Sequence, residues 1–215
     1  KISQDGFYPV IEAGLLGPDH NVVHGNFLPD EELRLMVEAG ASFTVTPAVE
    51  LQTSPTVTLM GRLLALGKQP SLGADAETFV AGDMFHVMRF ALQAQRIFDN
   101  QECARAEKPV ERLLSPRQVL EWATIEGARA LLMEDRVGSL TPGKQADLIC
   151  IPSGNINLAP VNDAVQAVVL YAERSDAESV MIGGEWLKRD GQLAFPAGEI
   201  ADNQQELAGA MERIY

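Results

Sequence analysis

Short β-like runs alternate with longer helical stretches over the first hundred residues, and this alternation constrains the fold more than any other feature of the chain. The predicted strands span residues 21–24, 42–46 and 71–74, and the predicted helices span residues 31–39, 57–66 and 82–99. Strands separated by helices of this length indicate βα units whose strands lie parallel in one sheet. Three such units are too few to close a parallel barrel, which needs eight strands.

The second half of the chain has a different pattern. Residues 100–114 are charged and predicted to be irregular, and Ser115-Pro116 is a good helix start, with helical spacing continuing to Leu132. After Gly138, Gly, Pro, Asn and Asp separate short segments that we expect to be strands. These segments span residues 146–151, 164–171, 179–182, 185–188 and 192–195, and a last helix is predicted over residues 202–214.

Bulk composition excludes several classes of protein. A hydrophobic content of 46% with 22% charged residues is ordinary for a globular chain of 215 residues. The net charge of −13 argues against a nucleic-acid surface, which needs clustered Lys and Arg. No apolar run approaches the ~18 residues of a membrane helix, so no membrane partner is expected.

Two further features bear on the chain's context. Cys103 and Cys150 are too few and too far apart for a disulfide scaffold or a zinc knuckle, which favours a reducing compartment, the cytoplasm. There is no basic-then-apolar leader, and the first residue is Lys1 instead of Met. We therefore expect the natural protein to have a further portion upstream.

The three histidines do not form a metal site by themselves. His20 and His24 are four residues apart, but Gly17-Pro18 before them favours loop and strand over helix. Four residues of strand span about 13 Å, so the two imidazoles would not meet one ion. His20 is expected at the surface, and His86 is expected on a helix face.

His24 and Asp75 stand out because each stands at the C-terminal end of a predicted parallel strand. In a βα barrel the chemistry lies at that end, where the βα loops converge. A partly buried carboxylate at Asp75 would need a metal, a cation or strong donors to stay ionised. The alternative from periodicity alone is a helix N-cap or a solvated loop residue.

The same residues resemble a known family. The segment Val22-Val23-His24-Gly25-Asn26 resembles the sixth-strand motif of the cytosine deaminase-like and triazine hydrolase branch of the amidohydrolase superfamily. Residues 43–47 are similar to its seventh strand, and residues 70–75, ending in Asp75, are similar to its eighth. Residues 138–148 resemble its Gly-Lys-x-Ala-Asp-Leu segment, which is quite specific to the superfamily.

The resemblance implies an α/β fold: the C-terminal part of a (β/α)8 barrel plus part of a small flanking β-sandwich. Residues 1–135 would form strands six to eight of the barrel with the helices that follow. Residues 136–200 would form strands of the sandwich, and residues 201–215 a C-terminal helix. Such an incomplete barrel leaves an exposed strand edge, which predicts association into a homo-oligomer, most simply a dimer.

The resemblance also implies roles for individual residues. Asp75 would bind one divalent metal, Zn or Fe, or its water, and would carry a proton. His24 would hydrogen-bond that water or the oxygen that forms at the attacked carbon. The family's remaining ligands, a His-x-His pair and a further His, have no counterpart here and would lie upstream of Lys1.

The sequence departs from the family at the loop of residues 47–52, which lacks the deaminases' Pro-x-x-Asn pattern. Glu50 and Gln52 in this loop could contact a different polar substrate, or they could be solvated. The implied function is a metal-dependent hydrolase of carbon–nitrogen bonds other than peptide bonds, deaminating or dechlorinating a small nitrogen heterocycle, with this chain inactive alone. The alternatives are a truncated, non-catalytic scaffold subunit and a cyclic-amide hydrolase.

Overall fold

A three-stranded parallel sheet forms the centre of the N-terminal half, as the alternation of the sequence predicts. The structure is a computed structural model, and it describes residues 6–53, 58–109 and 113–214. The strand order is β1 (Asn21–Val23), β2 (Ser42–Val45) and β3 (Ser71–Leu72). Val22 lies opposite Phe43, and Thr44 lies opposite Ser71, with all strands parallel.

Helices cover this sheet and bury its apolar side chains. They are α2 (Asp30–Glu38), α4 (Met60–Ala65) and the long α5 (Met84–Arg105), and α1 (Tyr8–Glu12) packs beside α2. Phe43 and Val45 of β2 are fully buried, together with Leu33 of α2 and Leu63 of α4. The alternating pattern of β2, with every second residue in the core, explains why this segment is a strand.

Two expectations about the helices need correction. Residues 47–52, predicted as a loop, belong to helix α3 (Pro47–Thr53), because Pro47 suits the first turn of a helix. Helix α5 continues to Arg105, so residues 100–105 are not irregular. Their charged side chains are those of a solvated helix face, which sequence pattern alone does not distinguish from a loop. Val57, predicted at the start of α4, lies outside the described residues.

The predicted helix start at Ser115-Pro116 is confirmed. Ser115 and Gln118 form a reciprocal capping box at the start of α6 (Pro116–Trp122), and Trp122 is fully buried. The helix does not continue to Leu132, however. The hydroxyl of Thr124 donates to the carbonyl of Leu120, and Thr124 leaves the helical conformation before α7 (Ile125–Ala130) begins.

The prediction of a strand over residues 164–171 is wrong, because this segment is helix α8 (Ala164–Leu170). The carboxylate of Asp163 caps the helix by accepting from the backbone N–H of Gln166 at 2.8 Å. Helix α8 packs against α5 and α6 and buries Val169 completely. Tertiary burial and the cap therefore outweigh the β preference of the valines.

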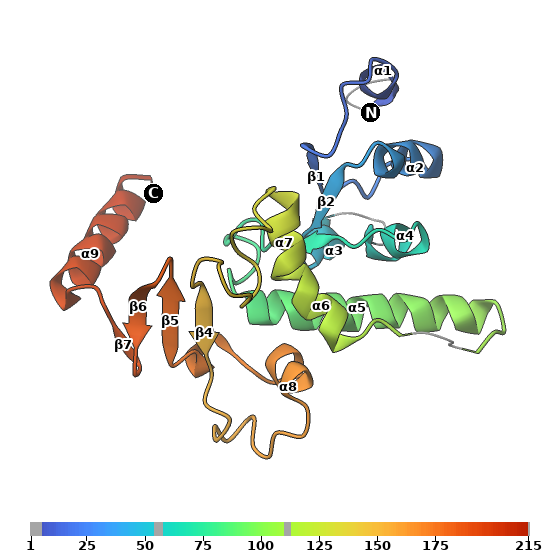
Figure 1. Ribbon diagram of the computed structural model, residues 1–215. Helices are drawn as coiled ribbons and strands as arrows, with labels where there is room; N and C mark the ends of the chain where they lie inside the picture. Colours follow the sequence, from blue (N-terminus) through green and yellow to red (C-terminus); the bar gives the residue numbers. More distant parts are fainter. Residues whose placement is uncertain (1–5, 54–57, 110–112, 215) are drawn as a thin grey trace.

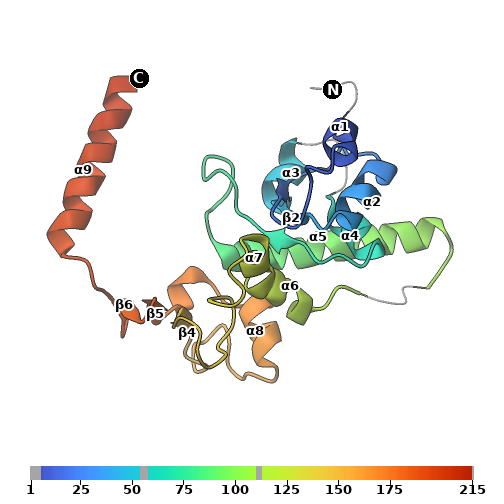
Figure 2. The ribbon, with the colours of Figure 1, turned by 45° about the horizontal axis from the view of Figure 1, so that its top comes forward.

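The second sheet is antiparallel and lies beside α8 (Figure 1). Its strands are β4 (Leu148–Cys150), β5 (Ser179–Ile182), β6 (Glu185–Arg189) and β7 (Gln192–Leu193). A short 3-10 helix (Arg174–Asp176) precedes β5, and α9 (Ala197–Ile214) follows β7. Helix α9 stands apart from both sheets in the two ribbon views (Figures 1 and 2). None of the described helices has the length and apolar character needed to cross a membrane.

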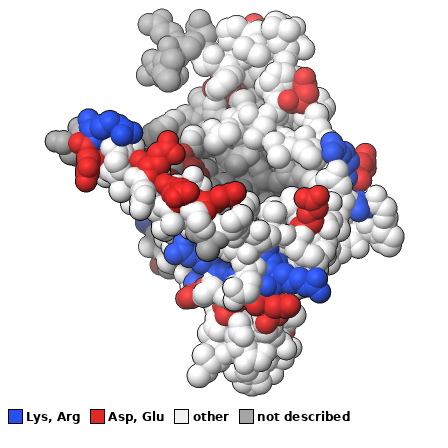
Figure 3. All heavy atoms as spheres, turned by 90° about the vertical axis from the view of Figure 1, so that its left-hand side faces the viewer, with Lys and Arg blue, Asp and Glu red and all other residues white. Residues whose placement is uncertain are grey.

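Charged side chains are mixed over the surface. On the face shown in Figure 3, acidic side chains lie on opposite sides of a central hollow, and basic side chains lie below it and near the left and right margins. Among the described residues of this face, Lys and Arg do not merge into a continuous basic patch. This distribution matches the excess of 30 Asp and Glu over 17 Lys and Arg in the sequence.

Candidate active site

The carboxyl ends of the three parallel strands meet at one edge of the sheet, and polar side chains follow each strand there. His24 follows β1, Thr46 follows β2, and Asp75 lies three residues beyond β3. The hydrogen bonding between β1 and β2 continues past the end of β1, because the backbone N–H of His24 donates to the carbonyl of Thr44 at 2.9 Å. The sheet therefore positions the backbone from which these side chains project.

His24 and Asp75 also share an uncommon backbone conformation. Their φ angles are 67° and 66°, in the left-handed region that favours glycine. A residue with a Cβ atom costs about 1–2 kcal/mol there. Such positions cluster at functional sites, where the surrounding structure holds them in place.

The two side chains approach each other at the strand ends. His24 Nε2 lies 3.7 Å from Asp75 Oδ2, and the side chains are 46% and 31% exposed. This distance exceeds that of a direct hydrogen bond and leaves room for a bridging atom. The structure thus brings together the two residues that the sequence singled out.

On its other side, the imidazole of His24 faces two groups that follow β2. Its Nδ1 lies 3.1 Å from Thr46 Oγ1 and 3.3 Å from Glu50 Oε1. Glu50 lies on α3, and its side chain is only 2% exposed. The backbone N–H of Thr46 donates to Glu50 Oε1 at 2.8 Å. Sequence reasoning missed Thr46, although its place at the C-terminal end of a predicted parallel strand is the signal that identified His24.

The remaining candidates lie elsewhere. Gln52 is exposed, and its amide donates to the carbonyl of Ala48 on its own helix at 2.6 Å. His20 is on the surface, 3.0 Å from Asp19 Oδ1. His86 is an exposed residue of α5 that lies beside Phe90.

His24 and Asp75 fit part of a metal site. An imidazole nitrogen and a carboxylate oxygen are ligand types that zinc and non-haem iron accept. Two zinc bonds to such atoms together span about 4 Å, so a separation of 3.7 Å suits two ligands of one ion. Within the described ranges, no three His, Cys, Asp or Glu side chains gather as one ligand set. These residues would therefore supply two of the three or more protein ligands that zinc takes.

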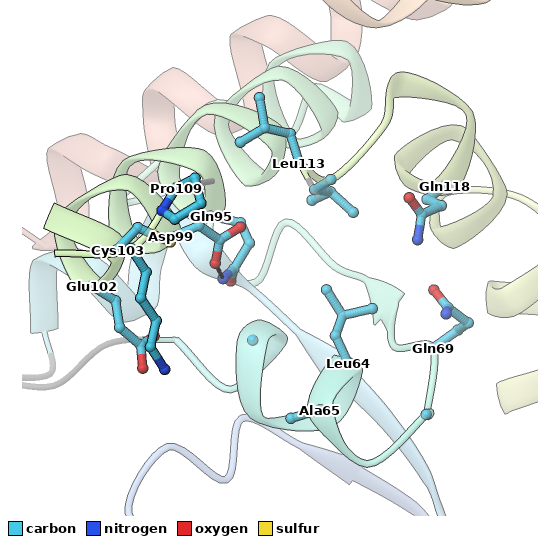
Figure 4. Close-up of a pocket in the computed structure, with 14 residues that line it drawn as sticks. Leu64, Ala65, Gln69, Gln95, Asp99, Glu102, Cys103, Pro109, Leu113 and Gln118 are labelled. Atoms are coloured by element: carbon cyan, nitrogen blue, oxygen red, sulfur yellow. Dashed lines mark hydrogen bonds between the residues drawn. The ribbon is translucent and has the colours of Figure 1, made fainter. Parts of the chain in front are cut away.

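A separate cleft of about 670 Å³ lies between α4, α5 and the start of α6. Leu64 and Ala65 of α4 line one side, and Gln95, Asp99 and Cys103 of α5 line another (Figure 4). The amide of Gln95 donates to Asp99 at 2.7 Å. None of the residues that line the cleft belongs to the group at the strand ends, so the two features are distinct.

Comparison with known sequences identifies relatives of this arrangement. The model of the "Amidohydrolase family" matches residues 10–187. The 5'-deoxyadenosine deaminase of Methanothermobacter thermautotrophicus is 30% identical over 183 residues, which are 85% of this chain and 40% of that protein. The 8-oxoguanine deaminase of Pseudomonas aeruginosa is 32% identical over 182 residues, 84% of this chain and 38% of that protein.

Solved structures agree on the fold. An adenosine deaminase from Xanthomonas campestris with bound zinc matches with a TM-score of 0.81 and 24% identity, over 96% of this chain and 46% of that one. An atrazine chlorohydrolase from Arthrobacter aurescens complexed with zinc matches with a TM-score of 0.79 and 22% identity, over 94% and 45%. The fold is thus part of an amidohydrolase barrel with an adjoining sheet, as the resemblance implied.

The extent of the matches is as informative as their identity. The chain spans about 40% of the length of the curated relatives that it matches. The family match covers most of the chain, including both strand ends that carry His24 and Asp75. The sequence resemblance to deaminases and triazine hydrolases is confirmed: the chain belongs to the amidohydrolase family.

Proposed function

We propose that the whole protein is a metal-dependent hydrolase that deaminates or dechlorinates a small nitrogen heterocycle, and that His24 and Asp75 belong to its metal centre. The observation that carries this proposal is the 3.7 Å approach of His24 Nε2 and Asp75 Oδ2 at the carboxyl edge of a parallel sheet. That edge is where barrel enzymes place their chemistry. The named activities of the relatives, on deoxyadenosine, oxoguanine and triazines, support the substrate class.

The roles of the two residues follow from their chemistry. A divalent ion, Zn or Fe, would supply a water whose pKa is lowered towards 7. Asp75 would accept a proton as the water oxygen bonds to the ring carbon. In deamination it would return a proton to the departing amine, and in dechlorination chloride would leave as the anion and the proton would pass to solvent. Its partial exposure of 31% leaves it accessible to substrate from the strand ends. His24 would ligate the ion or accept a hydrogen bond from the water through Nε2.

The remaining ligands would come from the rest of the whole protein, because this chain brings two donors together and zinc takes at least three. We therefore propose that the 215-residue chain alone is inactive and binds metal weakly. Glu50 and Gln52 were candidates for substrate contacts. The burial of Glu50 favours a different role for it, whereas Gln52 is exposed and remains a candidate.

We also propose that the whole protein works as a homodimer in the cytoplasm. Support for association comes from exposed apolar side chains of the second sheet. These side chains are Ile149, Ile182 and Leu193.

Metal analysis and turnover of the full-length protein test the proposed function. We expect about one equivalent of zinc or iron, and release of ammonia or chloride from a panel of amino- and chloro-substituted purines, pyrimidines and triazines. Asp75→Asn should abolish turnover, and Gln52→Ala should at most raise KM. A full-length protein that holds no metal and turns over none of the panel would instead favour the scaffold alternative. Release of product from cyclic amides alone would favour a cyclic-amide hydrolase.

A further inference from the structure

We infer that Glu50 is a positioning residue that holds His24 in one tautomer, with the proton on Nδ1 and the lone pair of Nε2 directed at Asp75. The inference deepens the proposed function and rests on it for its catalytic meaning. It starts from the contacts of Nδ1, which faces Thr46 Oγ1 at 3.1 Å and Glu50 Oε1 at 3.3 Å.

The two partners of Nδ1 differ in what they can do. A hydroxyl both donates and accepts, so Thr46 suits either tautomer of His24. A carboxylate has only acceptor oxygens, so Glu50 requires a hydrogen on the nitrogen that faces it. Glu50 therefore selects the tautomer, and Thr46 can then accept from Nδ1 or donate its own hydrogen to Oε1, which lies 3.3 Å from Oγ1.

Glu50 is held firmly enough for this role. Its side chain is 2% exposed, and Oε1 accepts from the backbone N–H of Thr46 at 2.8 Å. A buried carboxylate is costly unless donors surround it, so a hydrogen on Nδ1 also stabilises Glu50. The other oxygen, Oε2, is buried and has no hydrogen-bond partner among the described residues. The Glu50 carboxylate can thus accept more hydrogen bonds than Thr46 alone donates.

The consequence appears at the opposite side of the ring. With the hydrogen on Nδ1, Nε2 is an acceptor or a metal ligand, and it faces the carboxylate of Asp75 at 3.7 Å. Two acceptors face each other favourably only when a cation or a water lies between them. The same pattern, a ligating imidazole whose second nitrogen donates to a carboxylate, is the usual way in which metal sites orient histidine.

A purely structural role for Glu50 is the alternative. Its bond to the backbone N–H of Thr46 helps the chain to enter α3, and this would matter for folding without any effect on His24. The two roles make different predictions, because a structural role changes stability and leaves the tautomer of His24 unchanged.

The test is nitrogen NMR of the histidine side chains in the 15N-labelled 215-residue chain, at about pH 8.5, two units above the usual imidazole pKa of about 6.5. The chain has three histidines, and His24→Gln assigns the signals. Glu50→Met removes the acceptor, Glu50→Gln retains an acceptor oxygen, and Thr46→Val removes the hydroxyl. Glu32→Met is the matched control, because Glu32 is another carboxylate of 2% exposure, placed on α2.

We expect the Nδ1–H tautomer at His24 in the wild-type chain, in Glu50→Gln, in Thr46→Val and in Glu32→Met. In Glu50→Met, His24 should lose the Nδ1–H tautomer and shift towards the Nε2–H form. A wild-type signal of the Nε2–H form would overturn the inference without any variant, even if Glu50→Met does not fold. An unchanged tautomer in folded Glu50→Met, or its loss in Thr46→Val, would overturn it as well.

In the full-length protein, Glu50→Met should also lower metal affinity or turnover by about 10–100-fold, as loss of such orienting carboxylates does. The two proposals fail separately. If the tautomer responds as expected but the full-length protein neither holds metal nor hydrolyses the panel, the proposed function is wrong and the positioning of His24 stands. If metal and turnover are present but the tautomer ignores Glu50, only the inference is wrong.

Discussion

The φ angles of His24 and Asp75 differ by one degree, at 67° and 66°, although the residues are 51 positions apart in the chain. Both lie just beyond strands of the same parallel sheet, and their side chains approach to 3.7 Å. A left-handed backbone turns each side chain away from the course of its strand. The fold therefore uses one local conformation twice to direct two polar groups at one point.

This conformation predicts an unusual response to glycine. His24→Gly should be more stable than His24→Ala by about 1 kcal/mol, because both lose the side chain and only alanine keeps the left-handed penalty. Asp75→Gly and Asp75→Ala should show the same order. Urea denaturation measures the differences. Gln52 is the control: it lies within helix α3, so glycine there should be less stable than alanine by about 0.8–1 kcal/mol.

Gly138 should tolerate no side chain. Its φ is 87°, and a Cβ atom would lie 2.7 Å from Ala128 Cβ and 3.1 Å from Ile125 Cα of α7. We expect Gly138→Ala to cost about 1–2 kcal/mol for the backbone and a further 1–3 kcal/mol for the overlap. Gly143 has a φ of 97° and open space around it, so Gly143→Ala should lose only the stability that the strained backbone costs. Equal losses of thermal stability in the two variants would contradict the steric argument.

Asp176 should make stability depend on acid pH. Burial raises the pKa of its carboxyl, but hydrogen bonds from Asn157, the backbone N–H of Glu173 and Asn155 outweigh burial and lower the pKa below 3.8. A lowered folded-state pKa gives stability that is present above the unfolded pKa and is lost as pH falls through the folded one.

The free energy of unfolding of the wild type should therefore exceed that of Asp176→Asn by a constant amount above about pH 5. This difference should shrink below pH 3.8, the ordinary pKa of an aspartate carboxyl. Denaturant titrations at a series of pH values would measure it. Asp202→Asn, on exposed α9, serves as the control. An advantage that instead grows on acidification would show that the hydrogen bonds do not favour the ionised carboxyl.

The capping box at Ser115 should contribute measurably to stability. Ser115→Ala removes the acceptor for the backbone N–H of Gln118 and should cost about 1 kcal/mol. The loss should be larger than that of Ser139→Ala, because the hydroxyl of Ser139 is exposed and lies beside Thr141. Chemical denaturation of the two variants provides the comparison, and similar values would mean that the cap is not what fixes the start of α6.

Sequence pattern predicted the parallel sheet well, because β2 alternates between core and surface and the preceding helix α2 has a clear apolar face. It failed at α8, where an apolar run without clear helical spacing left strand and helix equally compatible. The cap at Asp163 and the packing on α5 decide that segment, and neither is visible in periodicity.

The candidate site was predictable only in part for a related reason. His24 and Asp75 each follow a strand, so local pattern and family resemblance both indicate them. Glu50 looked like a loop residue, and its burial depends on how α3 packs on α5 and places the side chain against His24 and Thr46. That packing is a tertiary relationship, so the role of Glu50 beside His24 could not be derived from neighbours in the sequence.

The two sheets differ in how they are buried, and we expect this difference to set the order in which the molecule opens. Residues of the parallel sheet enter the main hydrophobic cluster, whereas the side chains packed in that cluster include none from β4 to β7. Backbone amides of β2 should then exchange with solvent only on global unfolding, whereas those of β5 and β6 exchange through smaller local openings. His24 follows β1 and Glu50 lies on α3, both within the unit that we expect to open slowly, so the site should persist while the second sheet opens and closes.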